Sequence, residues 1–218
     1  MPPDQGWSTW EAVEINQMPL DPSPANYSKK PAIFLDRDGV LIEEVHYLSS
    51  IEQIVILPGV LDGLARLRLN GFLLVVTTNQ AGIARGMFSE ATLKEIHLHL
   101  DTLFLESGIR VSQWKYCPHH PTAGIGNYKI SCSCRKPKPG MVLEAAKELH
   151  IDLKKSYLIG DKISDVQAAK AAEVSPILVR TGYGKEHESL VQDSGISILG
   201  VANDFSEAVE MILLDQKN

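Results

Sequence analysis

Residues 31–39 read Pro-Ala-Ile-Phe-Leu-Asp-Arg-Asp-Gly. The apolar run in this segment is short and ends at a charge, which is typical of a strand buried on both faces of a sheet. Two carboxylates, Asp36 and Asp38, follow directly and can point into one site, where one attacks a phosphorus atom and the other protonates a leaving oxygen. Asp and Gly are also favoured in turns for backbone reasons, so this segment alone leaves a turn as the alternative.

Strand-like and helix-like segments alternate through the rest of the chain. Apolar runs predict further strands at residues 72–77, 111–116, 156–160, 176–180 and 196–199. Helical spacing and capping residues predict helices at residues 59–69, 89–104, 140–149, 164–172 and 205–214. This alternation predicts a Rossmann-like α/β fold, in which helices cover both faces of a parallel sheet.

The length of 218 residues suits one domain. Residues 31–218 are expected to form it, and residues 1–30, which contain five prolines, are expected to be an N-terminal extension. The net charge of −6 argues against a nucleic-acid partner, because a phosphate backbone requires a clustered basic surface. We find no leader-like start and no apolar stretch long enough to cross a membrane, so we expect a cytoplasmic protein. We further expect a monomer.

In a parallel sheet, ligands bind beyond the carboxyl ends of the strands. Asp36, Thr78 and Asp161 each follow a predicted strand, so we expect them to converge on one crevice. Asp161 would complete an oxygen-rich Mg²⁺ site with Asp36. Asp165 lies near the start of a predicted helix and suits two roles, support of the metal site or a cap of the helix.

Two further segments can hold the oxygens of a phosphate group. The hydroxyl of Thr78 and the neighbouring backbone N–H groups can donate to them, although a polar strand end is the ordinary interpretation. Arg135 and Lys136 can balance a dianion, the arginine as a fork and the lysine as a point charge. A solvated charge run is the alternative for this pair, but prolines interleave with its cations, and Pro139 suits the start of a helix.

Three cysteines and a histidine form two pairs with i, i+2 spacing: Cys117 with His119, and Cys132 with Cys134. Three thiolates and one imidazole can close a tetrahedral Zn²⁺ site, which would be structural because no position stays open. His120 is a rival ligand, and three reduced core cysteines are the alternative. The zinc would hold a long loop that ends at the two adjacent cations and would present them to a substrate.

In this order, the segments resemble the haloacid dehalogenase superfamily of phosphatases. Its pattern of Asp-x-Asp-Gly, a Thr or Ser after the second strand, a Lys before a later helix, and Gly-Asp-x-x-x-Asp is complete between residues 31 and 180. The resemblance implies that Asp36 is the nucleophile and that Asp38 acts as acid and then as base. It also implies that Thr78 and Lys136 bind the phosphoryl group. Mg²⁺ would be held by Asp36, the main-chain carbonyl of Asp38, and Asp161.

Four longer stretches look like the D-glycero-D-manno-heptose 1,7-bisphosphate 7-phosphatase family. They are Cys-Pro-His-His-Pro, Cys-x-Cys-Arg-Lys-Pro-x-Pro-Gly-Met, Thr-Asn-Gln-x-Gly-Ile-Ala-Arg-Gly and Gly-Asp-Lys. This resemblance implies a small-molecule sugar phosphate as substrate, on the way to nucleotide-activated heptose, and no large cap domain. With Arg135 and Lys136 acting in catalysis, the other substrate contacts would come from Arg37, Glu44, Val45, His46, Tyr47, Asn79, Gln80, Ala81 and Lys162.

The chain departs from that family at a few positions, and two other functions compete. Val40 and Ala81 stand where Thr and Ser are frequent, and neither change removes a catalytic group. A histidinol-phosphate phosphatase carries a similar zinc loop and would change the substrate, whereas the chemistry would stay the same. A non-catalytic zinc-stabilised module would predict loss of the catalytic carboxylates, and all of them are present.

Overall fold

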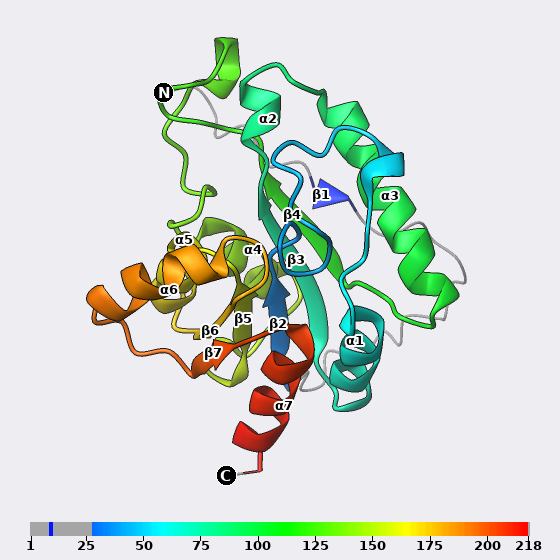
Figure 1. Cartoon of the computed structure of the whole chain (residues 1–218), viewed down its shortest axis with the longest axis vertical. Helices are drawn as coiled ribbons and strands as arrows, with labels where there is room; N and C mark the ends of the chain where they lie inside the picture. Colours follow the sequence, from blue (N-terminus) through cyan, green and yellow to red (C-terminus); the bar gives the residue numbers. More distant parts are fainter. Residues whose placement is uncertain (1–8, 11–27, 218) are drawn as a thin grey trace.

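The structure, a computed structural model, describes residues 9–10 and 28–217, so most of the predicted N-terminal extension lies outside the described residues. Within them, one sheet contains β1 (Thr9–Trp10), β2 (Ala32–Leu35), β3 (Leu73–Asn79), β4 (Gln113–Cys117), β5 (Tyr157–Gly160), β6 (Ser175–Val179) and β7 (Gly200–Ala202). Its order is β1-β4-β3-β2-β5-β6-β7 (Figure 1). Neighbouring strands are parallel, except that the edge strand β1 runs antiparallel to β4.

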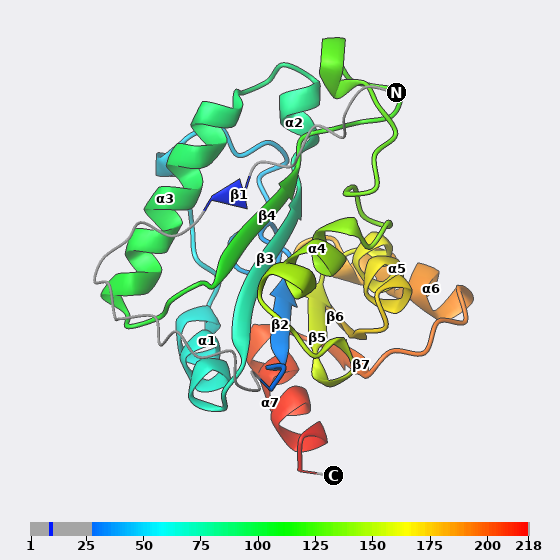
Figure 2. The same ribbon diagram turned by 180° about the vertical axis from the view of Figure 1, so that it is seen from behind.

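Helices cover both faces of the sheet (Figures 1 and 2). They are α1 (Val60–Leu69), α2 (Ala81–Ala84), α3 (Glu90–Glu106), α4 (Gly140–Glu148), α5 (Ile163–Ala171), α6 (Gly184–Asp193) and α7 (Phe205–Asp215). Alternate residues of β2 separate the two cores, because successive strand side chains point to opposite faces. Ile33 and Leu35 pack with α1, α3 and α7, whereas Ala32 and Phe34 pack with α4 and α5. The predicted α/β fold is therefore confirmed.

Two helices begin where the sequence predicted them. Ser89 precedes α3 and its Oγ accepts the N–H of Thr92 at 3.1 Å, which satisfies one free donor of the first turn. Pro139 is the residue before α4, and the helix starts at Gly140. The start of α4 matters for the site because Lys136 lies directly upstream.

The end of the chain differs from the prediction. The strand predicted at residues 196–199 lies later in the chain, at β7, which pairs with β6 from Gly200 onward. Ile196 and Ile198 instead pack beneath α6 with Val191. We did not predict α6, since only Gly184 and Val191 of its residues are buried and the helix has no apolar stripe.

The parallel strands bring their carboxyl ends to one edge of the sheet, where the loops after β2, β3, β5 and β6 meet. Asp36 continues from β2, and its N–H donates to the carbonyl of Ile159 in β5 at 3.0 Å. The segment between β4 and α4 forms the loop predicted to bind zinc. In the part of the chain that the structure describes, no helix has the length and apolar character needed to span a membrane.

Candidate active site

A pocket opens at the carboxyl edge of the sheet and collects most of the predicted site residues. The predicted residues that line it are Asp36, Arg37, Asp38, Glu44, His46, Tyr47, Thr78, Asn79, Gln80, Ala81, Lys136 and Lys162. Leu48, Gly82 and Ser164 line it as well; Gly82 belongs to the Thr-Asn-Gln-x-Gly stretch, whereas Leu48 and Ser164 had no signal in the sequence. Of the three strand-end residues predicted to converge, Asp36 and Thr78 line the pocket, and Asp161 lies outside the lining but near Asp36.

Lys136 is a buried cation of the pocket, as is Arg37. Its Nζ lies 3.1 Å from Asp36 Oδ2 and 2.6 Å from Asp165 Oδ1, and it donates to the Thr77 carbonyl at 2.7 Å. Burial lowers the pKa of Lys136, but the charges of Asp165 and Asp36 outweigh it, so the pKa is raised overall. Lys136 therefore stays charged beside Asp36, where a phosphate dianion would require a positive partner.

Asp165 has one of the two roles that the sequence left open, the helix cap, and it also pairs with Lys136. Its Oδ2 accepts the backbone N–H of Lys162 at 3.0 Å, which caps the start of α5. Its other oxygen pairs with Lys136, so the same carboxylate holds the lysine side chain in place. The carboxylate is fully buried, and burial raises its pKa, whereas Lys136 acts in the opposite direction.

Asp161 has the features of a cation ligand. It is fully buried; its Oδ2 accepts the N–H of Tyr183 at 2.9 Å, and its Oδ1 has no hydrogen-bond partner among the described residues. Burial, and then the charge of Asp36, raise the pKa of Asp161 to about 8. At Gly39 and Gly182, which have positive φ, an added Cβ would collide with Asp161 Oδ2. The backbone thus leaves space beside this carboxylate that only glycine can provide.

Asp36, Asp161 and Asp165 can each place one carboxylate oxygen within 4.8 Å of the other two. Lys136 lies between Asp36 and Asp165, and a cation beside Asp36 and Asp161 would offset the repulsion that remains among the three acids. Oxygen ligands of this type suit Mg²⁺. The residues present therefore fit the magnesium site expected from the sequence.

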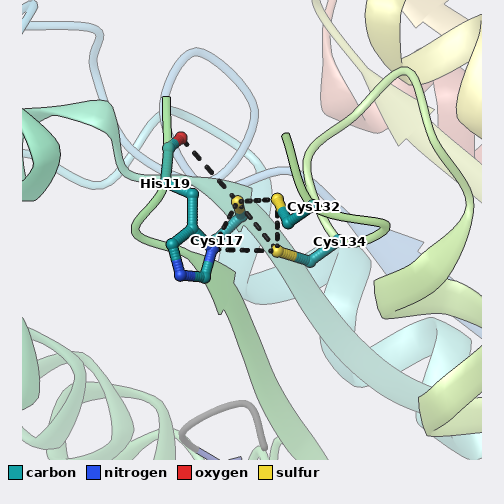
Figure 3. A group of neighbouring side chains, drawn as sticks. All are labelled: Cys117, His119, Cys132 and Cys134. Carbon is teal, nitrogen blue, oxygen red and sulfur yellow. Dashed lines mark hydrogen bonds between the residues drawn. The ribbon is translucent and has the colours of Figure 1, made fainter. Parts of the chain in front are cut away.

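The side chains at the zinc loop also meet as expected (Figure 3). Cys117, His119, Cys132 and Cys134 place their ligand atoms within 4.8 Å of one another. His119 Nδ1 lies 3.4 Å from the sulfur of Cys134, whereas His120 Nδ1 accepts the N–H of Ala123 at 2.9 Å. The Cys134 thiol lowers the pKa of Cys117 to about 6 through a hydrogen bond, which favours the thiolate that zinc requires. The geometry favours His119 over His120 and fits a Cys₃His zinc site.

Comparison with known proteins shows what the chain resembles. Residues 133–208 match the HAD-hydrolase-like family model. D-glycero-beta-D-manno-heptose-1,7-bisphosphate 7-phosphatase of Escherichia coli K12 is 45% identical over 153 residues, which cover 70% of this chain and 80% of that protein. The enzyme of the same name from Vibrio cholerae serotype O1 is 47% identical over 154 residues, 70% of this chain and 83% of that protein.

A solved structure agrees with these relatives. The D,D-heptose 1,7-bisphosphate phosphatase of B. bronchiseptica, complexed with magnesium and phosphate, has a TM-score of 0.74 and 34% identity. The match covers 85% of this chain and 99% of that one. The chain belongs to the heptose-bisphosphate phosphatase family of the haloacid dehalogenase superfamily. This membership makes it a phosphoric monoester hydrolase. The family that the sequence motifs predicted is confirmed.

Three predicted contact residues of this phosphatase have other neighbours. Arg135 is absent from the pocket lining, and its Nη1 donates to the carbonyl of His119 at 3.2 Å, which ties it to the zinc loop. Val45 also lies outside the lining and packs against the main core. Asn79 lines the pocket, but its amide forms two hydrogen bonds with the main chain of Lys136, at 3.0 and 3.1 Å, and so holds that segment.

At the mouth of the pocket, the phosphatase has a polar cluster that includes one residue we did not predict. Lys162 pairs with Glu44 at 3.1 Å and lies 4.5 Å from the ring centroid of Tyr183. The Tyr183 hydroxyl contacts His46 Nδ1 at 2.5 Å. Tyr183 follows β6 and could have been suspected from the strand-end rule, but no motif marks it.

Proposed function

We propose that this phosphatase removes the 7-phosphate of D-glycero-D-manno-heptose 1,7-bisphosphate, with Mg²⁺ as cofactor and an aspartyl phosphate on Asp36 as intermediate. The observation that carries the proposal is the position of Asp36, which lines the pocket beside Lys136 and close to Asp161, the acid with the features of a cation ligand. The names of the relatives at 45% and 47% identity support the substrate. The product would continue toward nucleotide-activated heptose.

The residues of the pocket suit two successive displacements at phosphorus. A carboxylate oxygen of Asp36 attacks the phosphorus, the bond to the sugar oxygen breaks, and Asp38 gives its proton to that oxygen. Asp38 then takes a proton from water, the water oxygen attacks the phosphorus, and phosphate leaves as Asp36 is regenerated. Thr78 and Lys136 bind the phosphoryl oxygens during both steps.

Two metals belong to the proposal. Mg²⁺ would be held by Asp36, Asp161 and the main-chain carbonyl of Asp38, and it would neutralise phosphate charge that these acids otherwise repel. The unpartnered oxygen of Asp161 supports this assignment. Zn²⁺ at Cys117, His119, Cys132 and Cys134 would be structural. The free cysteines suit a reducing compartment, so we also propose the cytoplasm; a monomer without a nucleic-acid or membrane partner remains a prediction.

The test is phosphate release from heptose 1,7-bisphosphate, fructose 1,6-bisphosphate and histidinol phosphate, with Mg²⁺ and with a chelator. We expect the heptose bisphosphate to give the highest kcat/KM, phosphorus NMR to show loss of the 7-phosphate, and the chelator to abolish turnover. A clear preference for histidinol phosphate would overturn the assignment of heptose 1,7-bisphosphate as the substrate. No turnover of any phosphate ester would overturn the enzymatic function.

A further inference from the structure

Behind the pocket, α3 places a buried histidine against the arginine that lies between the two catalytic acids. His97 is 2% exposed, and its Nε2 lies 3.3 Å from Nη1 of Arg37. A guanidinium can only donate, so Nε2 accepts and the imidazole proton is on Nδ1. Nδ1 has no hydrogen-bond partner among the described residues, so the hydrogen bond from Arg37 anchors this ring.

The imidazole ring is fixed from its other side. It stacks on the Trp114 ring, with centroids 4.5 Å apart and planes inclined by 26°. Trp114 is itself held, because its Nε1 donates to Asp101 Oδ1 at 2.9 Å and its ring stacks on Phe104. Burial and the charge of Arg37 hold the pKa of His97 well below its usual range, so the ring is a neutral acceptor.

Arg37 directs its Nε and Nη2 at Asp38. Its Nε lies 3.1 Å from Oδ1 of Asp38, and its Nη2 lies 2.9 Å from Oδ1 and 3.0 Å from Oδ2. The Arg37 side chain has no exposed surface, whereas that of Asp38 keeps 16% exposure toward the pocket. Gln80 adds one hydrogen bond to Asp38 Oδ2 at 3.0 Å. A planar fork of this kind fixes both the distance and the tilt of a carboxylate.

We propose that His97 and Arg37 are positioning residues for Asp38, with His97 anchoring the guanidinium and the guanidinium aiming the carboxylate at the leaving oxygen. This inference rests on the proposed function of Asp38. Without His97, the buried Nη1 of Arg37 loses its acceptor and the guanidinium can rotate toward another one. Because acid catalysis requires hydrogen-bond contact with the leaving oxygen, a small shift of Asp38 lowers the rate of proton transfer.

The experiment compares two leaving groups, because only one of them requires the proton of Asp38. A sugar alkoxide must be protonated as it leaves, whereas p-nitrophenolate leaves without help. The variants are His97→Leu, which lacks the acceptor, and His97→Gln, which keeps one. His99→Leu is the matched control, since His99 lies on the same helix and outside the pocket lining. The value measured is kcat/KM, which includes the departure of the leaving group and excludes the later hydrolysis of the aspartyl phosphate.

For His97→Leu, we expect kcat/KM for heptose 1,7-bisphosphate to fall about tenfold to a hundredfold, as for a catalytic group displaced by a fraction of an ångström. For p-nitrophenyl phosphate it should stay within about twofold of wild type, and His97→Gln should recover much of the loss on the sugar. Equal losses on both substrates, or no loss on the sugar, would overturn the positioning role, and thermal unfolding shows whether equal losses come from misfolding. An inactive wild-type enzyme would instead count against the proposed function.

Discussion

Replacement of Lys136 by Met removes the cation that two buried carboxylates share. Lys136 Nζ lies 3.1 Å from Asp36 and 2.6 Å from Asp165, and the lysine side chain is 2% exposed. Removal of one partner of a buried ion pair costs about 3–5 kcal/mol, because the other charge stays buried and unpaired. Met fills a similar volume, and a carboxylate can take up a proton. We therefore expect the free energy of unfolding to fall by about 3 kcal/mol at neutral pH without Mg²⁺.

The size of this loss depends on pH. Burial raises the pKa of Asp165 above its usual 3.8, and Lys136 opposes that shift in the wild type. In Lys136→Met the lysine charge that lowers the pKa of Asp165 is absent. The folded state of the variant therefore binds the Asp165 proton more tightly than the unfolded state does. An acid with a raised folded pKa favours folding below that pKa and loses this contribution as the pH rises through it. The deficit of the variant should be largest at neutral and slightly alkaline pH and shrink toward the usual pKa of an aspartate.

Urea unfolding monitored by circular dichroism measures the loss in the free energy of unfolding. The control is Lys147→Met on α4, which removes an exposed lysine and should change the free energy of unfolding by less than about 0.5 kcal/mol. Addition of Mg²⁺ should recover part of the loss, because a cation between the carboxylates replaces the missing charge. Unchanged stability of Lys136→Met at slightly alkaline pH, or a deficit that grows on acidification, would refute the electrostatic reasoning.

Three further predictions concern the metals and the pocket mouth. Since the pKa of Asp161 is raised to about 8, Mg²⁺ binding at neutral pH should release protons, and the affinity should rise as the pH rises toward that value. Calorimetry in buffers of different ionisation enthalpy measures the proton release, and an affinity that does not depend on pH would contradict the prediction. Cys132→Ser should lower both zinc content and Tm and reduce kcat, because the loop that leads to Lys136 loses a ligand; a zinc-free native protein with normal Tm would argue against it. Tyr183→Phe should raise KM for the sugar about threefold to tenfold with little change in kcat, since it removes the hydroxyl beside His46; an unchanged KM would remove Tyr183 from the substrate site.

Local patterns predicted much of the site because they coincide with fold geometry. The apolar run before Asp36 forms β2, and parallel strands end at one edge, so Asp161 could be placed beside Asp36 from the sequence. The two i, i+2 pairs predicted the Cys₃His cluster, because ligand spacing within each pair is a local property.

The parts that could not be predicted depend on contacts between distant segments. His97 and Arg37 are sixty residues apart, and nothing in the sequence around His97 marks it as more than a core residue of a helix. Arg135 follows the zinc loop directly, yet its guanidinium turns back to a carbonyl of that loop, a direction that spacing alone does not determine. The last strand begins later than predicted, because the apolar residues at 196 and 198 pack in a small core before the chain joins the sheet, and Val201 of β7 packs in the same core.

The most direct test of the account is to trap the phosphorylated enzyme. Heptose bisphosphate labelled at the 7-phosphate would be mixed with the Mg²⁺-loaded enzyme and quenched in acid within one turnover, and the peptides would be mapped by mass spectrometry. We predict one labelled peptide with the phosphate on Asp36, and no label or turnover in Asp36→Asn. Turnover without any protein-bound phosphate, or label on another residue, would contradict the central role of Asp36.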